Sequence, residues 1–282
     1  MKKTVRYFLL ACFLLIPFWA KGYVLHVENK THTLNTIKET SPALAFGISG
    51  TTYYAPLVPA SVENHLHFLK DDTVYSICDI SDDYCIENGK LYWAHPDLYV
   101  KSSGTQYIDT GIVPDLNTAI EIEIADTSIT TYSLFGVKTG TTVATETGFG
   151  ISLESGKFGF FRNGAETTTI KKDNDYHVYY LSNTAASVDG VSYDFAAGTK
   201  PLTEPQTMYI FGFNHNGYAY DKAMKVRYLK IWNGNTLIRH YVPVYEGLVI
   251  GTFVVPENGL FDIVNQIFYP PQGAGSLTYG KE

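Results

Sequence analysis

The chain has 282 residues, of which 45% are hydrophobic, 15% aromatic and 17% charged. This composition provides enough apolar surface for a packed core, so it excludes an intrinsically disordered protein. The formal net charge is −7 and the sequence holds no block of lysine and arginine. Both observations argue against nucleic acid as a partner and against a polybasic membrane patch. The length fits two domains, or one large all-β domain with a small one.

The first 22 residues have the pattern of a secretory signal peptide. Basic residues open the chain, residues 7–20 are almost wholly apolar, and Ala20-Lys21-Gly22 supplies the small residues of a cleavage site. The apolar run is too short to span a bilayer, so we expect cleavage before Tyr23, a secreted or cell-surface location, and no membrane insertion after cleavage. Cleavage removes four basic and no acidic residues, which leaves a net charge of −11. An uncleaved membrane anchor is the alternative.

Residues 23–98 read as a small β-module. The segments 46–53 and 68–75 share one pattern, in which an aromatic strand, a two-residue polar turn and a second strand follow each other. This pattern predicts two β-hairpins. Residues 23–45 are less regular, and we expect no more than one strand there.

Two cysteines, Cys78 and Cys85, follow the signal segment. In an exported chain such a pair predicts a disulfide, which would stabilise a module whose own core is small. Metal ligation is the alternative, but it needs two more soft ligands, and none lies at zinc-like spacing.

From residue 99 to residue 282 the sequence has the pattern of many short strands. Ile120, Ile122 and Ile124 alternate with Glu121 and Glu123, which predicts a strand with one buried and one wet face. Further strands are expected over 157–162, 208–213, 225–232 and 236–244, with turns at Asn163-Gly164, Asp189-Gly190 and Asn233-Gly234. No window shows a helical period, so the pattern indicates an all-β sandwich or barrel.

Motifs at both ends of this region resemble one family. The segment 99–112, YVKSSGTQYIDTGI, resembles the opening of LamG-like jelly-roll domains, which belong to the concanavalin A-like lectin/glucanase superfamily. The segments 226–244 and 259–269 resemble the late strand pair and the closing strand of these domains. The resemblance covers residues 99–280 and implies an antiparallel jelly-roll β-sandwich. We expect Gly104–Ile108 to pair with Phe268-Tyr269, as such a fold requires.

The resemblance also bears on function, because the superfamily hosts lectins, hydrolases and inert spacers. Some of its glucanases carry two catalytic acids on one strand, and Glu121, Glu123 and Asp126 resemble that pattern with altered spacing. A glycoside hydrolase using Glu121 and Asp126 is therefore the alternative enzyme hypothesis. A solvated strand face explains the same acids, and we do not expect an enzyme or a catalytic residue.

A second candidate site is the segment from Asn214 to Asp221, between two expected strands. Amide, imidazole and aromatic groups in one exposed loop suit sugar hydroxyls and pyranose faces, although a polar turn has the same composition. The candidate ligand-binding residues are Asn214, His215, Asn216, Tyr218 and Tyr220.

Metal and cofactor motifs are weak. His65 and His67 form a possible pair without a third ligand, and four acids lie around the cysteines but lack the pattern of a dedicated calcium loop. These acids are Asp79, Asp82, Asp83 and Glu87. We therefore expect no metal site and no cofactor, with Ca²⁺ as a weak alternative. We also expect Arg239 to bond backbone carbonyls or a carboxylate such as Asp262.

These observations favour an exported, non-catalytic binding or structural module, with a glycan or a surface protein as its partner. Besides the hydrolase, the alternative is an architectural spacer of a surface or phage-like appendage.

Overall fold

The computed structural model describes the chain from residue 22 onward, with gaps. The described ranges are 22–27, 30–36, 43–48, 51–59, 66–70, 73–77, 83–87, 89–126, 132–139, 147–154, 157–162, 165–171, 173–193, 205–221 and 223–282. Every regular element within these ranges is a β-strand, which confirms the all-β class. Within these ranges, no helix is long and apolar enough to cross a membrane. Residues 1–21 lie outside the described ranges, so the signal peptide stays a prediction.

The chain divides into two compact units, Met1–His95 and Pro96–Glu282. The division falls after His95, whereas the sequence placed a domain boundary after Leu98. Each unit is described by itself below.

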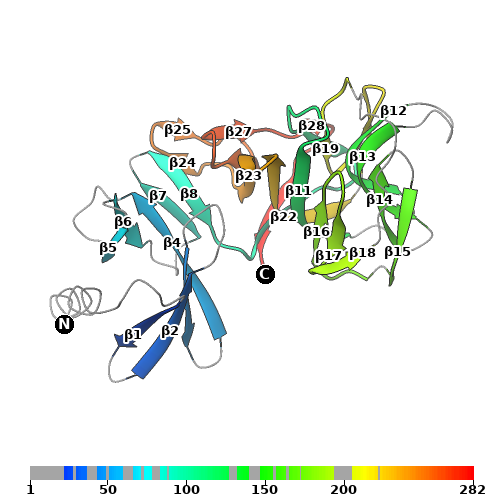
Figure 1. Cartoon of the computed structure of the whole chain (residues 1–282). Coiled ribbons are helices and arrows are strands. Elements are labelled where there is room, and N and C mark those ends of the chain that lie inside the picture. The colour runs from blue at the N-terminus through cyan, green and yellow to red at the C-terminus, as the bar shows by residue number, and fades with distance from the viewer. Residues whose placement is uncertain are drawn as a thin grey trace. The chain divides into compact units, whose positions relative to one another are not determined.

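The first unit contains a six-stranded antiparallel sheet and a separate hairpin (Figure 1). The order in the sheet is β1-β2-β3-β4-β6-β5. The strands are β1 (Gly22–Val27), β2 (Lys30–Thr36), β3 (Ala43–Ile48), β4 (Thr51–Pro59), β5 (Leu66–Lys70) and β6 (Thr73–Ile77), and the hairpin is β7 (Tyr84–Glu87) with β8 (Lys90–Ala94).

Both hairpins predicted in this unit are confirmed. Phe46 pairs with Tyr53 across β3 and β4, and Phe68 pairs with Tyr75 across β5 and β6. The expectation of no more than one strand in residues 23–45 is wrong, because β1 and β2 pair there along their whole length. Local pattern misses this pair because its polar and apolar residues do not alternate cleanly.

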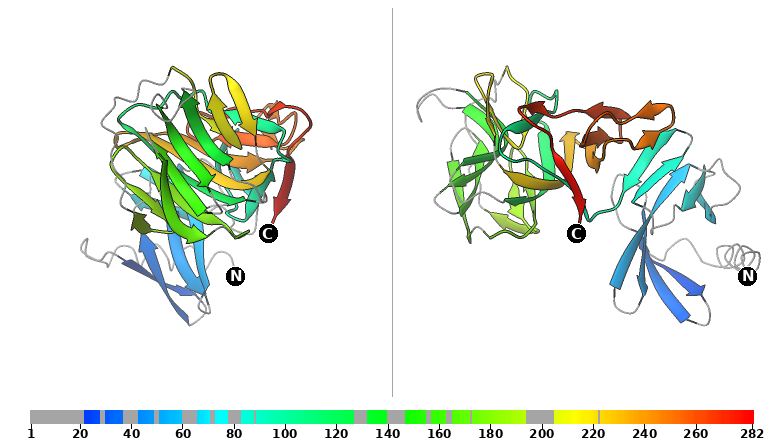
Figure 2. Two further views of the ribbon diagram at one scale, coloured as in Figure 1. Left: turned by 90° about the vertical axis from the view of Figure 1, so that its right-hand side faces the viewer. Right: turned by 180° about the vertical axis from the view of Figure 1, so that it is seen from behind.

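The second unit is built mainly from two sheets (Figure 2). A ten-stranded sheet has the order β18-β17-β16-β11-β22-β23-β26-β27, with β9 pairing β22 and β29 pairing β9. A six-stranded sheet has the order β15-β14-β13-β12-β20-β21. Smaller sheets are β19-β10-β28 and β24-β25.

The strands of this unit are β9 (Leu98–Lys101), β10 (Gln106–Asp109), β11 (Thr118–Asp126), β12 (Tyr132–Thr139), β13 (Thr147–Glu154), β14 (Lys157–Arg162), β15 (Ala165–Lys171), β16 (His177–Leu181), β17 (Ala186–Val188), β18 (Val191–Tyr193), β19 (Tyr209–Ile210), β20 (Gly212–His215), β21 (Tyr218–Asp221), β22 (Met224–Asn233), β23 (Thr236–Val244), β24 (Val249–Ile250), β25 (Phe253–Val254), β26 (Gly259–Asp262), β27 (Ile267–Tyr269), β28 (Gln272–Gly273) and β29 (Thr278–Lys281).

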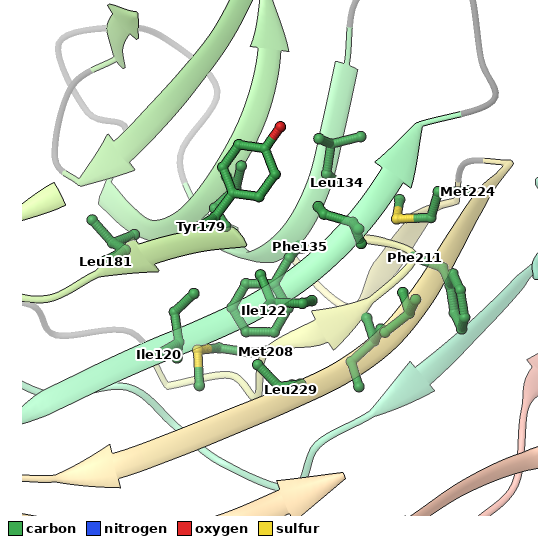
Figure 3. Close-up of a cluster of buried hydrophobic side chains, with 14 of the residues drawn as sticks. Ile120, Ile122, Leu134, Phe135, Tyr179, Leu181, Met208, Phe211, Met224 and Leu229 are labelled. Carbon is green, nitrogen blue, oxygen red and sulfur yellow. The ribbon is translucent and has the colours of Figure 1, made fainter. Parts of the chain in front are cut away.

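Side chains from the two large sheets meet in one hydrophobic core (Figure 3). Ile120 and Ile122 of β11 and Leu229 of β22 come from the ten-stranded sheet, and Phe135 of β12 comes from the other. All four are fully buried. The second unit is therefore a two-layer β-sandwich, and the predicted half-buried strand around Ile120 is confirmed.

Two details of the predicted topology differ from the structure. Residues 268–269 lie in β27 and pair with β26, while the strand that contains Gln106 pairs with β28 and β19. The expected partnership between Gly104–Ile108 and Phe268-Tyr269 is therefore wrong, since the chain after Tyr269 supplies two further strands. The sandwich is also not wholly antiparallel, because β12 and β20 are parallel.

The turn predictions rest on residues that readily adopt a positive φ. Asp189 and Gly190 have φ angles of 51° and 77° between β17 and β18, and Gly234 has a φ of 58° between β22 and β23, as expected. Asn163-Gly164 lies outside the described ranges.

Candidate functional site

The side of the ten-stranded sheet that faces away from the core is called the outer face here. Because successive side chains of a strand alternate, Glu121 and Glu123 of β11 lie on the outer face while the isoleucines between them are buried. The strand register places Tyr180, Glu121, Lys230 and His240 in one row across β16, β11, β22 and β23. The row is thus assembled from four strands, of which β11 and β16 are far from the β22–β23 hairpin in the sequence.

Glu121 lies near the centre of this row and is tied to β22. Its carboxylate accepts a hydrogen bond from the Lys230 ammonium at 3.1 Å and one from the Tyr228 hydroxyl at 3.0 Å. The Lys230 side chain is only 12% exposed, so solvent screens this ion pair less than a surface pair. The Lys230 ammonium also lies 5.0 Å from the centre of the Tyr228 ring.

A β-bulge places Arg227 beside Glu123. The register of β11 and β22 shifts between Glu123 and Ile124, so that Arg227 is the extra residue of β22. Its guanidinium donates to Glu123 at 2.9 Å and lies 3.7 Å from the centre of the Tyr176 ring. Burial raises the pKa of Glu123, while the hydrogen bond and the positive charge of Arg227 oppose that rise.

The same arginine contacts two more carboxylates at the edge of the outer face. Its second terminal nitrogen lies 3.5 Å from Glu282 and 3.9 Å from Asp97. Glu282 also forms an ion pair with Lys225, whose ammonium lies 4.7 Å from the centre of the Tyr99 ring. Cationic groups and aromatic rings therefore alternate along this edge.

His240 closes the row on β23 and is kept neutral. Burial and the nearby charge of Lys230 lower the pKa of His240 from 6.5 to about 3. Its Nδ1 atom is buried and has no hydrogen-bond partner among the described residues, and its ring meets the Tyr228 ring edge-on at 6.3 Å.

The outer face combines ion-paired carboxylates with partly exposed aromatic rings. Each glutamate already accepts a hydrogen bond from a cationic partner. Tyr180 and Trp232 are partly exposed on the same sheet, and aromatic side chains that combine an apolar ring with a polar tip are common in binding surfaces.

The two acids of the hydrolase hypothesis both belong to β11, and their pairing stays a prediction. Glu121 and Asp126 are five positions apart on β11, which pairs without a break with β16 from Ile120 to Ile124. An odd separation places two positions on opposite faces of a regular strand. The side chain of Asp126 lies outside the description, so Glu121 and Glu123 are the acids that share the outer face.

The segment from Asn214 to Asp221 forms a tight hairpin between β20 and β21. Asn216 and Gly217 form its turn, with φ angles of 53° and 84°. Asn214 is 4% exposed and has a structural role. Its side-chain NH2 group donates to Thr207 O at 3.0 Å, and its side-chain oxygen accepts from Gly217 N at 3.0 Å. Asn216 is exposed and His215 partly buried, while the side chains of Tyr218 and Tyr220 lie outside the description.

The other candidate residues fall mostly outside the described residues. This applies to His65, Cys78, Asp79 and Asp82, and to the side chains of His67 and Glu87. Cys85 is 2% exposed and Asp83 is partly buried. Within the described part of the chain, no three His, Cys, Asp or Glu side chains are grouped to hold a metal ion. The disulfide and the calcium alternative therefore stay predictions.

The expected role of Arg239 is confirmed. Its Nη1 donates to Ile238 O at 2.9 Å and its Nε lies 3.5 Å from the Asp262 carboxylate. No sequence motif pointed to four residues of this face, which are Arg227, Tyr176, Lys230 and His240. The polar positions that alternate with apolar ones over Lys225–Trp232 are the signal that could have pointed to β22.

Comparisons with known proteins give little further information. No family model matches the chain, and no curated protein matches it. Solved structures of Trypanosoma rangeli sialidase show a distant likeness: one with 2,3-difluorosialic acid as a covalent intermediate is 9% identical with a TM-score of 0.32, and one with the inhibitor DANA is 10% identical with a TM-score of 0.33. Each match covers 76% of this chain, and 51% and 60% of those chains, so this chain spans between half and three fifths of their length. TM-scores this low carry no argument about function.

Proposed function

We propose that the protein is an exported, non-catalytic binding module and that the outer face of its sandwich binds a glycan. The observation that carries the proposal is the row Tyr180, Glu121, Lys230 and His240, which joins an aromatic ring to a line of hydrogen-bonding groups across four strands. Sugar rings stack on aromatic faces, and their hydroxyls hydrogen-bond to carboxylates and ammonium groups.

The electrostatics of the outer face also support a glycan. The ion pairs Glu121–Lys230 and Glu123–Arg227 fix the orientation of the charged groups before any ligand arrives. A pre-organised site loses less side-chain entropy on binding. The large negative net charge of the exported chain argues against nucleic acid and anionic membranes as alternative partners.

A glycan screen of the purified protein tests the proposal. We expect Tyr180→Ala to weaken binding about tenfold, since it removes the stacking ring. Tyr245→Ala is the matched control, because Tyr245 is an exposed tyrosine beyond the end of β23. Asn216→Gly tests the β20–β21 hairpin, since glycine keeps the positive φ of that turn.

Three outcomes contradict the proposal. Loss of binding in Asn216→Gly but not in Tyr180→Ala moves the site to the hairpin. Capture of a surface protein with no glycan bound makes the module a protein receptor. No ligand of either kind leaves the architectural spacer as the better explanation.

The glycoside hydrolase is the second candidate, and one observation favours it. Burial raises the pKa of Glu123, and a raised pKa is what a catalytic acid requires. Reducing-sugar release that disappears in Glu123→Gln and Glu121→Gln, but persists in the exposed Asp175→Asn, would establish an enzyme. We expect no release from the unmodified protein.

We also propose that the second unit is a LamG-like jelly roll, that residues 1–22 are a cleaved signal peptide and that Cys78 bonds to Cys85. The two-layer sandwich over residues 96–282 supports the first of these, and the burial of Cys85 agrees with the last. The mass of the exported protein tests both the cleavage and the disulfide. We expect an N-terminus at Tyr23 and no thiol that reacts with iodoacetamide before reduction.

A further inference from the structure

His177, at the start of β16, lies between two carboxylates from different segments. Its Nδ1 is 2.6 Å from Asp189, in the β17–β18 turn, and its Nε2 is 3.0 Å from Asp173, in the segment before β16. The His177 side chain is 14% exposed, while Asp173 and Asp189 are about half exposed. The imidazole therefore joins the segment 173–176 to the turn at Asp189.

This geometry requires an imidazolium. An ionised carboxylate can only accept hydrogen bonds, and a neutral imidazole has only one N–H to donate. Both contacts are at hydrogen-bond distance, so both ring nitrogens must carry a proton. Burial lowers the pKa of His177, but the hydrogen bonds and charges of Asp189 and Asp173 outweigh it and raise that pKa above 6.5.

The position of Asp189 is fixed by a further hydrogen bond and by its backbone conformation. Its second carboxylate oxygen accepts a hydrogen bond from the Val178 amide at 2.9 Å, and its backbone has a φ of 51°, which aspartate adopts more readily than most residues other than glycine. Asp173 likewise accepts from the Asp175 amide at 2.9 Å. Asp173 is thus anchored within its own segment and Asp189 is anchored to Val178 of β16, so the contact of the imidazolium with Asp173 ties segment 173–176 to β16 and its neighbouring turn.

The tied segment carries a residue of the outer face. Tyr176 directly precedes His177, and its ring is the one on which the Arg227 guanidinium packs at 3.7 Å. Arg227 in turn donates a hydrogen bond to Glu123 at 2.9 Å, and the negative charge of Asp189 contributes to the raised pKa of Glu123. His177 is therefore linked to the charged groups of the outer face through the backbone of Tyr176 and the contacts of Arg227.

We propose that His177 is a proton-controlled clip that holds Tyr176 over Arg227 and thereby sets the outer face in its binding form. When the imidazolium loses a proton, one ring nitrogen keeps a lone pair that faces a carboxylate, so one of the two contacts must break. Loss of the contact with Asp173, which is the longer of the two, frees segment 173–176 to move, and Tyr176 moves with it. The regulatory part of this inference rests on the proposed function of the outer face, whereas the clip itself does not.

The charged groups around His177 come from four segments of the chain. The segment before β16 contributes Asp173, and the β17–β18 turn contributes Asp189. On β11 the residue paired with His177 is the apolar Ile124, and Glu123 precedes it in the sequence. On its own strand His177 meets the Tyr179 ring at 6.2 Å, and on β22 the cations Arg227 and Lys225 lie 3.7 Å and 5.9 Å from the centre of the Tyr176 ring.

NMR of the full protein tests the clip without any ligand. We expect the His177 ring nitrogens to titrate above 6.5, and Asp173→Asn or Asp189→Asn to lower that midpoint by about one pH unit. Asparagine tolerates the positive φ of position 189, so the turn is retained. Asp175→Asn is the matched control, since Asp175 lies in the same segment and its described contact to Asp173 is through its backbone amide.

The coupling has its own signal. While Tyr176 covers Arg227, the ring shifts the Arg227 side-chain protons upfield, and we expect these resonances to move with the midpoint of His177. An unchanged His177 midpoint in both aspartate variants overturns the clip. If the Arg227 resonances do not change as His177 titrates, the link between His177 and the outer face is overturned.

Ligand binding then separates this inference from the proposed function. If a glycan binds, its affinity should be several-fold higher at about pH 5.5 than at about pH 8.5, and His177→Gln should remove the difference. Equal affinity at both pH values overturns the regulation. If no glycan binds while His177 and Arg227 titrate together, the proposed function fails and the clip stands.

Discussion

Asp262 shows how one buried carboxylate can organise a turn. It is fully buried at the end of β26 and accepts hydrogen bonds from the amides of His240 and Val264 at 3.0 Å and from the side chain of Asn265 at 2.7 Å. We expect Asp262→Ala to lower the free energy of unfolding by about 3 kcal/mol or more, because it leaves these donors and Arg239 without their acceptor. Denaturant unfolding measures the loss.

Asp262→Asn is the control for this prediction, because asparagine keeps an acceptor oxygen and the shape of the side chain. We expect a smaller loss from it than from alanine. Equal stability of the alanine variant and the original protein would show that water replaces the carboxylate.

His240 gives the opposite pH response to His177. In the unfolded chain its pKa is near 6.5, whereas in the folded protein burial and Lys230 lower the pKa to about 3. Between these values only the unfolded state binds the proton, so stability falls as the pH falls through this window, by at most about 1.4 kcal/mol per pH unit. Denaturant unfolding at several pH values should show a shallower acid slope in His240→Gln. An unchanged slope would show that His240 is protonated in the folded state.

The sequence predicted the contact between Arg239 and Asp262, but it did not predict which residues form the outer face. Arg239 and Asp262 were expected to meet, because both stand in motifs with a known structural use. Arg227 and Tyr176 were not, since their contact depends on a bulge in β22 that brings an extra residue onto the outer face. No local pattern marks a bulge of this kind.

At the scale of elements, glycines in β12 and β13 set how closely these strands and their neighbours approach. A Cβ atom at Gly150 would lie 2.1 Å from Phe135 O and 2.6 Å from the ring of Phe213. We expect Gly150→Ala to destabilise the protein by about 2 kcal/mol or more, because backbone and ring must both move. Thermal unfolding checks the effect.

Gly234→Ala is a suitable comparison for this prediction. A Cβ at Gly234 would meet nothing within 4 Å, and only its φ of 58° opposes alanine. We expect a cost of about 1 kcal/mol there. A Gly150 variant that is no worse than the Gly234 variant would mean that the six-stranded sheet adjusts freely.

The sequence predicted some strand pairs correctly and missed others. Strands joined by short turns were predicted with their partners, as in β3–β4, β5–β6 and β22–β23, because turn residues and alternation are local signals. The parallel pair β12–β20 and the edge pair β9–β29 join segments that are distant in the sequence. Their pairing is decided by how the sheets stack, which local pattern does not contain.

At the scale of the whole molecule, the second unit has a core of its own. The buried cluster that includes Ile108, Ile122, Phe149 and Leu229 lies entirely within Pro96–Glu282. We expect residues 96–282 to fold without the first unit and to unfold in one cooperative transition. Circular dichroism and thermal unfolding of that fragment test this, and a fragment without a transition would show that the first unit is needed.

The pairing of β9 with β29 has a consequence for how this unit can be connected. Leu98, near its beginning, lies opposite Lys281, near its end. Its two ends therefore leave from neighbouring positions, as in guest domains that sit in a surface loop of a host protein. Such a guest adds a sandwich to its host without forcing the host loop apart. For the same reason a short peptide could join the two ends, and new ends could be opened at the exposed turn of Asn233-Gly234.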